Sequence, residues 1–211
     1  MPLPHHSILP VTIDDVPTLG GFLASSKLQL AINRFLFKDW PNEAAQLANY
    51  TQAVGHGLSD PNVTSLKVVC HDSQEIVAHL GLSLRQGTAK GAPGDEMPVP
   101  DAMVPDVFYA VTDAIQSLNQ GIANKDHMEL TWIFVKPSAR NQGIGTELVQ
   151  AAIKKAQEAA LPLLFNSEPP VHGFFLKLGF AETKTVDIDL SKWAPPYCGW
   201  GLFRLSAMAL R

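Results

Sequence analysis

The residues that decide the fold run from Glu129 to Thr146 and read ELTWIFVKPSARNQGIGT. The apolar run Leu130–Val135 predicts a β-strand, and a short polar loop follows it after Pro137. The loop ends in Gly-Ile-Gly at 143–145, and apolar residues then recur at the spacing of an α-helix. We therefore expect a strand, a glycine loop and a helix in direct succession.

This glycine loop has the features of an anion site. Glycines at the start of a helix leave backbone N–H groups accessible, because no side chain shields them. The helix dipole adds partial positive charge at the same place, so a phosphate or pyrophosphate is the ligand that suits it. Arg140 and Gln142 are candidates for additional side-chain donors. The alternative is a tight turn between strand and helix that binds no ligand.

Two common phosphate loops fit this sequence poorly. A Walker A loop ends in Gly-Lys-Ser/Thr, whereas Gly145 is followed here by Thr146 and Glu147. A Rossmann fingerprint needs a third glycine where Leu148 stands, and it places its first glycine directly after the strand. The sequence therefore excludes the first motif and disfavours the second.

Composition excludes several classes of protein. The 211 residues, 46% apolar and 17% charged, describe an ordinary globular chain. A formal net charge of −4 does not indicate nucleic-acid binding, and no segment has the length and apolar character of a membrane span. The two cysteines, Cys70 and Cys198, lie far apart and the histidines lack metal-ligand spacing, so we expect no metal site. The start of the sequence does not resemble a secretory leader, and we expect a cytoplasmic location.

Strands and helices alternate along the rest of the chain. A short helix is expected from Val16 to the Gly20-Gly21 pair. Further helices are expected at 27–37, 43–54, 106–120 and 169–178, and strands at 7–13, 65–70, 75–84, 161–165, 183–190 and 200–210. This order predicts a mixed sheet with helices on both faces, interrupted by an insertion at about 86–127.

The motif Arg140-x-x-Gly143-x-Gly145, after a strand and a Val-x-Pro step, resembles the acetyl-CoA-binding signature of the GNAT superfamily of N-acetyltransferases. A Leu-Gly-Phe at 178–180 is a second point of resemblance. The resemblance implies an α/β (α+β) fold with a mixed, mostly antiparallel central sheet of six to seven strands and helices on both faces. It implies a single domain over residues 1–211. The N-terminal Thr-x-x-Asp, the Phe-Leu-Phe-x-x-Trp-Pro stretch and the insertion look like a branch common in fungi.

The resemblance also implies which residues contact acetyl-CoA as co-substrate. Backbone groups of Ile133, Phe134 and Val135 would bind the pantetheine arm and the thioester. The pyrophosphate would be wrapped by the loop and helix start, namely Arg140, Asn141, Gln142, Gly143, Ile144, Gly145 and Thr146. Two later positions complete the predicted set of cofactor-binding residues, Asn166 and Phe175.

Phe175 is the main departure from the family pattern. Family members often carry a tyrosine at this position, and that tyrosine protonates the leaving thiolate. Phenylalanine has no proton to give, so water or another group would take this role, with Tyr197 and Cys198 as candidates. Coenzyme A is a tolerable leaving group as a thiolate, so we expect a slower enzyme rather than an inactive one.

Amine acetylation also needs a group that removes a proton from the ammonium. Glu129 lies six residues before Val135, and it matches the general-base glutamate of histone-acetyltransferase members of the superfamily. Strand alternation places His127, Glu129 and Thr131 on one face. His127 is the second candidate, because imidazole titrates near neutral pH. The alternative for Glu129 is a solvated carboxylate at the start of a strand.

Together these observations predict an N-acetyltransferase that moves an acetyl group from acetyl-CoA to a primary amine by direct attack. The acceptor is a small molecule or a peptide, and the sequence contains no motif that selects among them. Neither nucleic acid nor membrane is an expected partner, and the protein is expected to be a monomer or a homodimer. The alternative is a non-catalytic protein that binds or senses acyl-CoA on the same fold.

Overall fold

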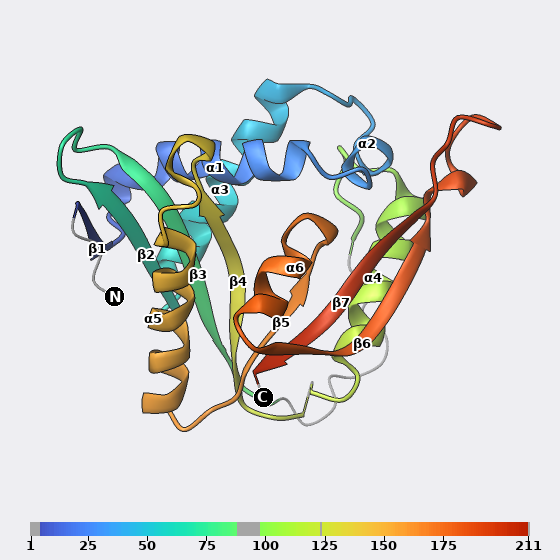
Figure 1. Cartoon of the computed structure of the whole chain (residues 1–211). Helices are drawn as coiled ribbons and strands as arrows, with labels where there is room; N and C mark the ends of the chain where they lie inside the picture. The colour runs from blue at the N-terminus through green and yellow to red at the C-terminus, as the bar shows by residue number, and fades with distance from the viewer. Residues whose placement is uncertain (1–4, 88–97, 123, 211) are drawn as a thin grey trace. The chain divides into compact units, whose positions relative to one another are not determined.

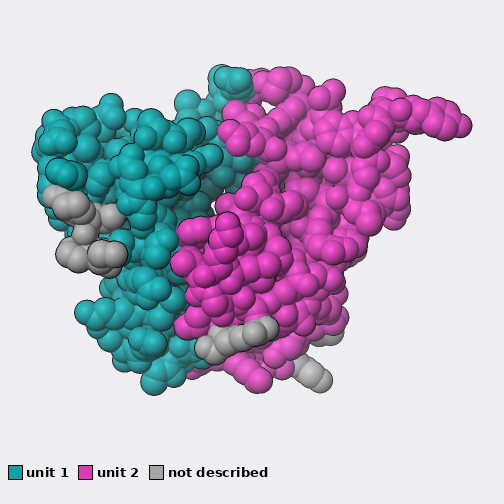
Figure 2. Space-filling view, viewed as in Figure 1, with its two compact units in different colours: residues 1–27, 43–85, 127–163 teal, residues 28–42, 86–126, 164–211 magenta. Residues whose placement is uncertain are grey.

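The computed structural model describes residues 5–87, 98–122 and 124–210. The chain forms two compact units, which Figure 2 colours separately. Unit 1 contains residues 1–27, 43–85 and 127–163, and unit 2 contains residues 28–42, 86–126 and 164–211. The predicted insertion at 86–127 belongs mostly to unit 2, and its segment 88–97 lies outside the described residues.

Unit 1 is built on a four-stranded antiparallel sheet with the order β1-β2-β3-β4 in the described chain. Its strands are β1 (His6–Pro10), β2 (Val63–Cys70), β3 (Ile76–Arg85) and β4 (His127–Val135). Its helices are η1 (Ile13–Asp15), α1 (Val16–Leu28), α3 (Glu43–Ser59), η2 (Pro137–Ala139) and α5 (Ile144–Glu158). Figure 1 shows α5 on one face of this sheet and α1 and α3 on the other.

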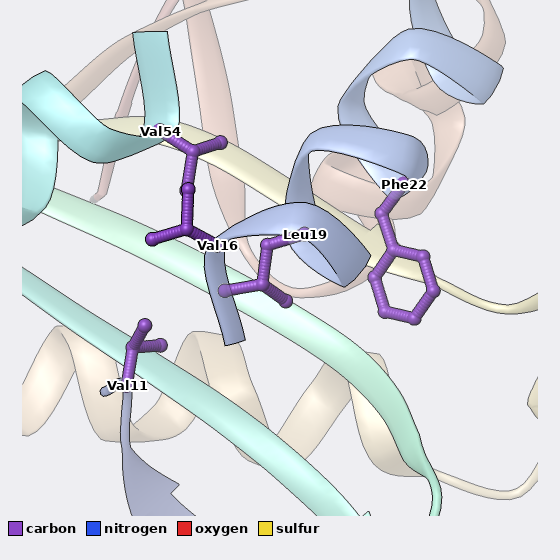
Figure 3. Close-up of a cluster of buried hydrophobic side chains, with 5 residues drawn as sticks. All are labelled: Val11, Val16, Leu19, Phe22 and Val54. Carbon is purple, nitrogen blue, oxygen red and sulfur yellow. The ribbon is translucent and has the colours of Figure 1, made fainter. Parts of the chain in front are cut away.

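A compact apolar cluster lies under the first helix of unit 1. Figure 3 shows its five buried members, Val11, Val16, Leu19, Phe22 and Val54. They come from the segment after β1, from α1 and from α3, and Phe134 of β4 packs against them. Val54 of α3 and Phe134 of β4 are distant from α1 in sequence, so this cluster joins the N-terminal helix to the sheet that carries the glycine loop.

The prediction that Gly20-Gly21 ends the first helix was wrong. Helix α1 continues through both glycines to Leu28. A Cβ atom at Gly20 would lie 2.7 Å from the Cα of Thr51 in α3, so glycine permits a close approach of the two helices. The predicted second helix at 27–37 is accordingly reduced to the short α2 (Asn33–Leu36).

Unit 2 holds three antiparallel strands in the order β5-β7-β6 in the described chain. These strands are β5 (Leu163–Ser167), β6 (Phe180–Asp189) and β7 (Leu202–Leu210). Its helices are α2, α4 (Pro105–Asn119), α6 (Pro169–Lys177) and η3 (Leu190–Lys192). Helices α4 and α6 both pack against β6 and β7. The predicted strands, the hairpin β2–β3 and the helix within the insertion all occur in the described residues.

Among the described residues, no helix combines the length and the apolar character needed to cross a membrane.

Candidate acyl-donor and base residues

The glycine loop of unit 1 contains two residues with positive φ angles. After β4 the chain makes the short helix η2 and then turns through Asn141, which has a φ of 63°. Gly143 follows with a φ of 82° and is the N-cap residue of α5. A Cβ at Gly143 would meet no atom within 4 Å. Glycine is therefore needed here for its backbone angle and not for space.

The start of α5 has backbone N–H groups that make no helical hydrogen bond. The first helical bond runs from the N–H of Glu147 to the carbonyl of Gly143, at 3.0 Å. The N–H groups of Ile144, Gly145 and Thr146 precede this bond, so the helix itself offers them no acceptor. In the described residues no side chain caps this helix. These donors, together with the helix dipole, fit a phosphate or pyrophosphate group.

The two polar side chains of the loop brace its main chain. Arg140 donates from Nε to the carbonyl of Val135 at 3.1 Å, and Gln142 donates from Nε2 to the carbonyl of Ser138 at 3.4 Å. Both residues are exposed. A guanidinium has five N–H donors, so Arg140 keeps others for a ligand while it holds the loop in place.

The predicted pantetheine residues lie at the end of β4, which is the last strand of the unit 1 sheet. Ile133, Phe134 and Val135 pair with β3, opposite Leu80, His79 and Ala78. The ring of Phe134 stacks on Phe22, with centroids 4.7 Å apart. The side chain of Phe134 therefore packs on the α1 side of the sheet. Any contact of this residue with a cofactor would use its backbone.

The predicted base Glu129 is held by an arginine that sequence reasoning missed. Arg85, the last residue of β3, donates from Nε to Oε2 of Glu129 at 2.5 Å. The side chain of Glu129 is 23% exposed and that of Arg85 is 50% exposed. His127, directly opposite Arg85, is 8% exposed. A partner for Glu129 could be found only from the register of β3 on β4, which the sequence does not reveal.

The regular alternation predicted for β4 is broken by a β-bulge. Leu82 of β3 pairs with Leu130, but the preceding residue of β3, Gly81, pairs with Trp132. Thr131 is therefore the extra residue of β4. The Thr131 hydroxyl lies 2.6 Å from that of Ser83, which is opposite Glu129. Bulges re-aim side chains and are frequent beside functional sites. The isolated Gly81 in the run of β3 is the sign of it in the sequence, because a glycine inside a strand is typical of a bulge or a close approach.

A buried polar cluster lies on the α1 side of the same sheet. Asp15 accepts hydrogen bonds from Lys67 at 2.5 Å and from the N–H and hydroxyl of Thr12 at 2.7 and 2.9 Å. Burial alone would raise the pKa of Asp15, but the bonds from Lys67 and Thr12 outweigh it and lower that pKa. Nε2 of His79 lies 3.2 Å from the hydroxyl of Ser65. Burial lowers the pKa of His79 to about 4, and the carboxylate of Asp15 opposes this shift with a smaller effect.

The remaining predicted cofactor residues belong to unit 2. Asn166 of β5 donates from Nδ2 to Oδ1 of Asn119 in α4, at 3.1 Å. The ring of Phe175 is 1% exposed and packs with Phe165 and Phe180, at centroid distances of 4.3 and 5.8 Å. Phe175 is therefore a core residue of unit 2. Tyr197 lies in the segment between η3 and β7, fully exposed.

Comparison with protein families matches residues 29–180 to the acetyltransferase (GNAT) family. A structure of histone acetyltransferase HPA2 and related acetyltransferase from Corynebacterium glutamicum is similar, with 14% identity, a TM-score of 0.61, and coverage of 98% of this chain and 96% of that one. A protein assigned as arylalkylamine N-acetyltransferase 7 from the mosquito Aedes aegypti has 16% identity, a TM-score of 0.66, and coverage of 98% and 88%.

A point mutant of the spermidine N-acetyltransferase SpeG from Vibrio cholerae has 10% identity, a TM-score of 0.54, and coverage of 98% and 93%. At such low identity these structures establish a shared fold. Comparison with curated protein sequences finds no match. The predicted fold class, a mixed α/β arrangement with a mostly antiparallel sheet, is confirmed.

Proposed function

Because this chain belongs to the acetyltransferase (GNAT) family, we propose that it transfers an acetyl group from acetyl-CoA to a primary amine. The observation that carries the proposal is the start of α5. A left-handed Gly143 leads into a helix whose first N–H groups have no helical acceptor and no side-chain cap in the described chain. This arrangement suits the pyrophosphate of coenzyme A.

The residues of unit 1 supply binding and orientation for this reaction. The loop Arg140–Thr146 binds the pyrophosphate, mainly through main-chain N–H groups. The backbone of Ile133, Phe134 and Val135 binds the pantetheine arm, and an N–H near Val135 stabilises the negative charge that develops on the carbonyl oxygen. The resemblance to the family supports these assignments, as do the uncapped helix and the position of the three residues at the end of β4.

Glu129 is the proposed general base. It takes a proton from the substrate ammonium, directly or through a water, so that the neutral nitrogen can attack the thioester carbon. A carbon–nitrogen bond forms, the carbon–sulfur bond breaks, and coenzyme A leaves as a thiolate that is then protonated. Phe175 has no proton to give and is packed in the core, so water is the simplest donor. His127 remains the second candidate for the base.

The acceptor is a small-molecule or peptide amine. Similar structures include proteins named for arylalkylamines and for spermidine, and both kinds of molecule carry a primary amino group. We extend to this chain only that shared chemistry. The proposal further includes a single domain over residues 1–211 and membership of the GNAT branch common in fungi. It also includes a cytoplasmic location and a monomeric or dimeric state, with neither nucleic acid nor membrane as a partner.

A non-catalytic protein that binds or senses acyl-CoA is the second candidate. Phe175 favours it, because a tyrosine that often acts as the acid in this family is replaced here by a buried phenylalanine. Glu129 argues against it, because a carboxylate that is 23% exposed remains accessible to an amine.

Acetylation rates across a panel of primary amines, measured for the wild type and for Glu129→Gln, separate the two candidates. An enzyme acetylates at least one amine, and loss of the base slows that reaction by about 100-fold. A protein that binds acetyl-CoA but acetylates none of the amines supports the sensing function. If Glu129→Gln retains the full rate and the same pH profile, Glu129 is not the base.

A further inference from the structure

The ion pair between Arg85 and Glu129 joins the ends of two neighbouring strands. Arg85 ends β3, and Glu129 is the third residue of β4. In the register of these strands Arg85 lies opposite His127 and Ser83 lies opposite Glu129, so the arginine reaches its partner diagonally. The contact is short, 2.5 Å from Nε to Oε2, and charge-assisted hydrogen bonds of this kind are among the stronger ones.

Two other polar neighbours of Glu129 contact each other. The hydroxyls of Ser83 and Thr131 lie 2.6 Å apart, and the Thr131 hydroxyl is 3.5 Å from the main-chain carbonyl of Glu129. Arg85 binds the carboxylate of Glu129 through a direct ion pair. It binds a single oxygen, Oε2, and the contact leaves Oε1 for another proton or donor.

We propose that Arg85 is a positioning residue for Glu129, an inference that rests on the proposed function. By binding Oε2, Arg85 holds the carboxylate in one orientation and presents Oε1 to the proton that Glu129 removes. A free glutamate side chain samples several rotamers, so its carboxylate would spend less time in the productive orientation. The pair is half exposed on the arginine side, so it contributes little to stability, and its effect on the rate is separable from folding.

The test compares kinetic constants of Arg85→Gln, Arg85→Lys, Glu129→Gln and the double variant Arg85→Gln/Glu129→Gln, with an amine that the wild type acetylates. Arg85→Gln is expected to lower kcat about tenfold, with the KM for acetyl-CoA and the melting temperature unchanged. Arg85→Lys is expected to recover most of that loss, because one oxygen accepts one bond and an ammonium can donate it. In the double variant the rate should equal that of Glu129→Gln alone.

A matched control is available at the other end of β3. Glu75 forms an exposed ion pair with Lys136 at 3.1 Å, and Glu75→Gln should leave kcat unchanged. If Arg85→Gln also leaves kcat unchanged while Glu129→Gln slows the reaction, Arg85 does not position the base and the proposed function stands. If the losses from the two single variants multiply in the double variant, Arg85 acts independently of Glu129. If Glu129→Gln is fully active, the base assignment fails and the positioning role fails with it.

Discussion

His79 should make folding stability sensitive to mild acid, and His79→Gln should remove that sensitivity. The side chain lies on β3 with 2% exposure, near the cluster formed by Asp15 and Lys67. Burial lowers its pKa from 6.5 to about 4, although the carboxylate of Asp15 favours the charged form. Glutamine cannot titrate, yet its amide can still hydrogen-bond to Ser65, the partner of His79 at 3.2 Å.

The sign and size of the effect follow from proton linkage. In the unfolded chain His79 binds a proton as the pH falls below 6.5, whereas in the folded protein it stays neutral until about pH 4. The unfolded state therefore gains protons first, and the contribution of His79 to stability is lost as the pH falls from 6.5 towards 4. Between pH 7 and pH 4.5 this amounts to a loss of about 2 kcal/mol in the free energy of unfolding.

Urea titrations of wild type and His79→Gln at pH 7, 6, 5 and 4.5 measure this loss directly. The variant is less stable at pH 7, but the gap between the two proteins should narrow by about 2 kcal/mol at pH 4.5. In thermal melts this corresponds to a relative shift of about 4–8 °C. If the difference in unfolding free energy between the two proteins stays constant over this pH range, His79 has an ordinary pKa in the folded protein. Burial would then not disfavour its protonated form.

Three further substitutions test packing, two in unit 1 and one in unit 2. Gly20→Ala is expected to destabilise the protein by about 1–3 kcal/mol, because a Cβ would lie 2.7 Å from the Cα of Thr51. Gly21→Ala in the same helix has no atom within 4 Å of the new Cβ, so it should stabilise by about 0.5–1 kcal/mol, and equal effects in urea titrations would refute the close helix contact. Phe175→Tyr is expected to cost about 1–3 kcal/mol, because its hydroxyl is added at a site only 1% exposed. If Phe175→Tyr is instead stable and acetylates faster, this position faces the reacting groups rather than the core.

The parts of the site that depend on local sequence could be predicted. A strand, a glycine loop and an amphipathic helix are specified by neighbouring residues, and β4, the loop and α5 follow one another in the predicted order. The hairpin β2–β3 and the antiparallel strands of unit 2 follow in the same way from alternation and turn residues.

The parts that depend on residues distant in sequence could not be predicted. The ion pair of Arg85 with Glu129 requires the register between β3 and β4, and the bulge at Thr131 changes that register in mid-strand. The path of α1 through Gly20 likewise depends on α3, which approaches it too closely for a side chain. In each case the deciding contact joins segments more than 30 residues apart, and local propensity carries no information about it.

The most direct test of the central claim is calorimetric titration with acetyl-CoA of the wild type, Gly143→Glu and Gly179→Glu. Both variants place a glutamate where φ is positive, 82° at Gly143 and 90° at Gly179, so they carry similar backbone strain. Only Gly143→Glu places a negative charge at the start of α5. The account predicts micromolar binding by the wild type and by Gly179→Glu, and no binding by Gly143→Glu. Absence of binding by the wild type, or equal binding by Gly143→Glu, would contradict the claim that this loop holds the acyl donor.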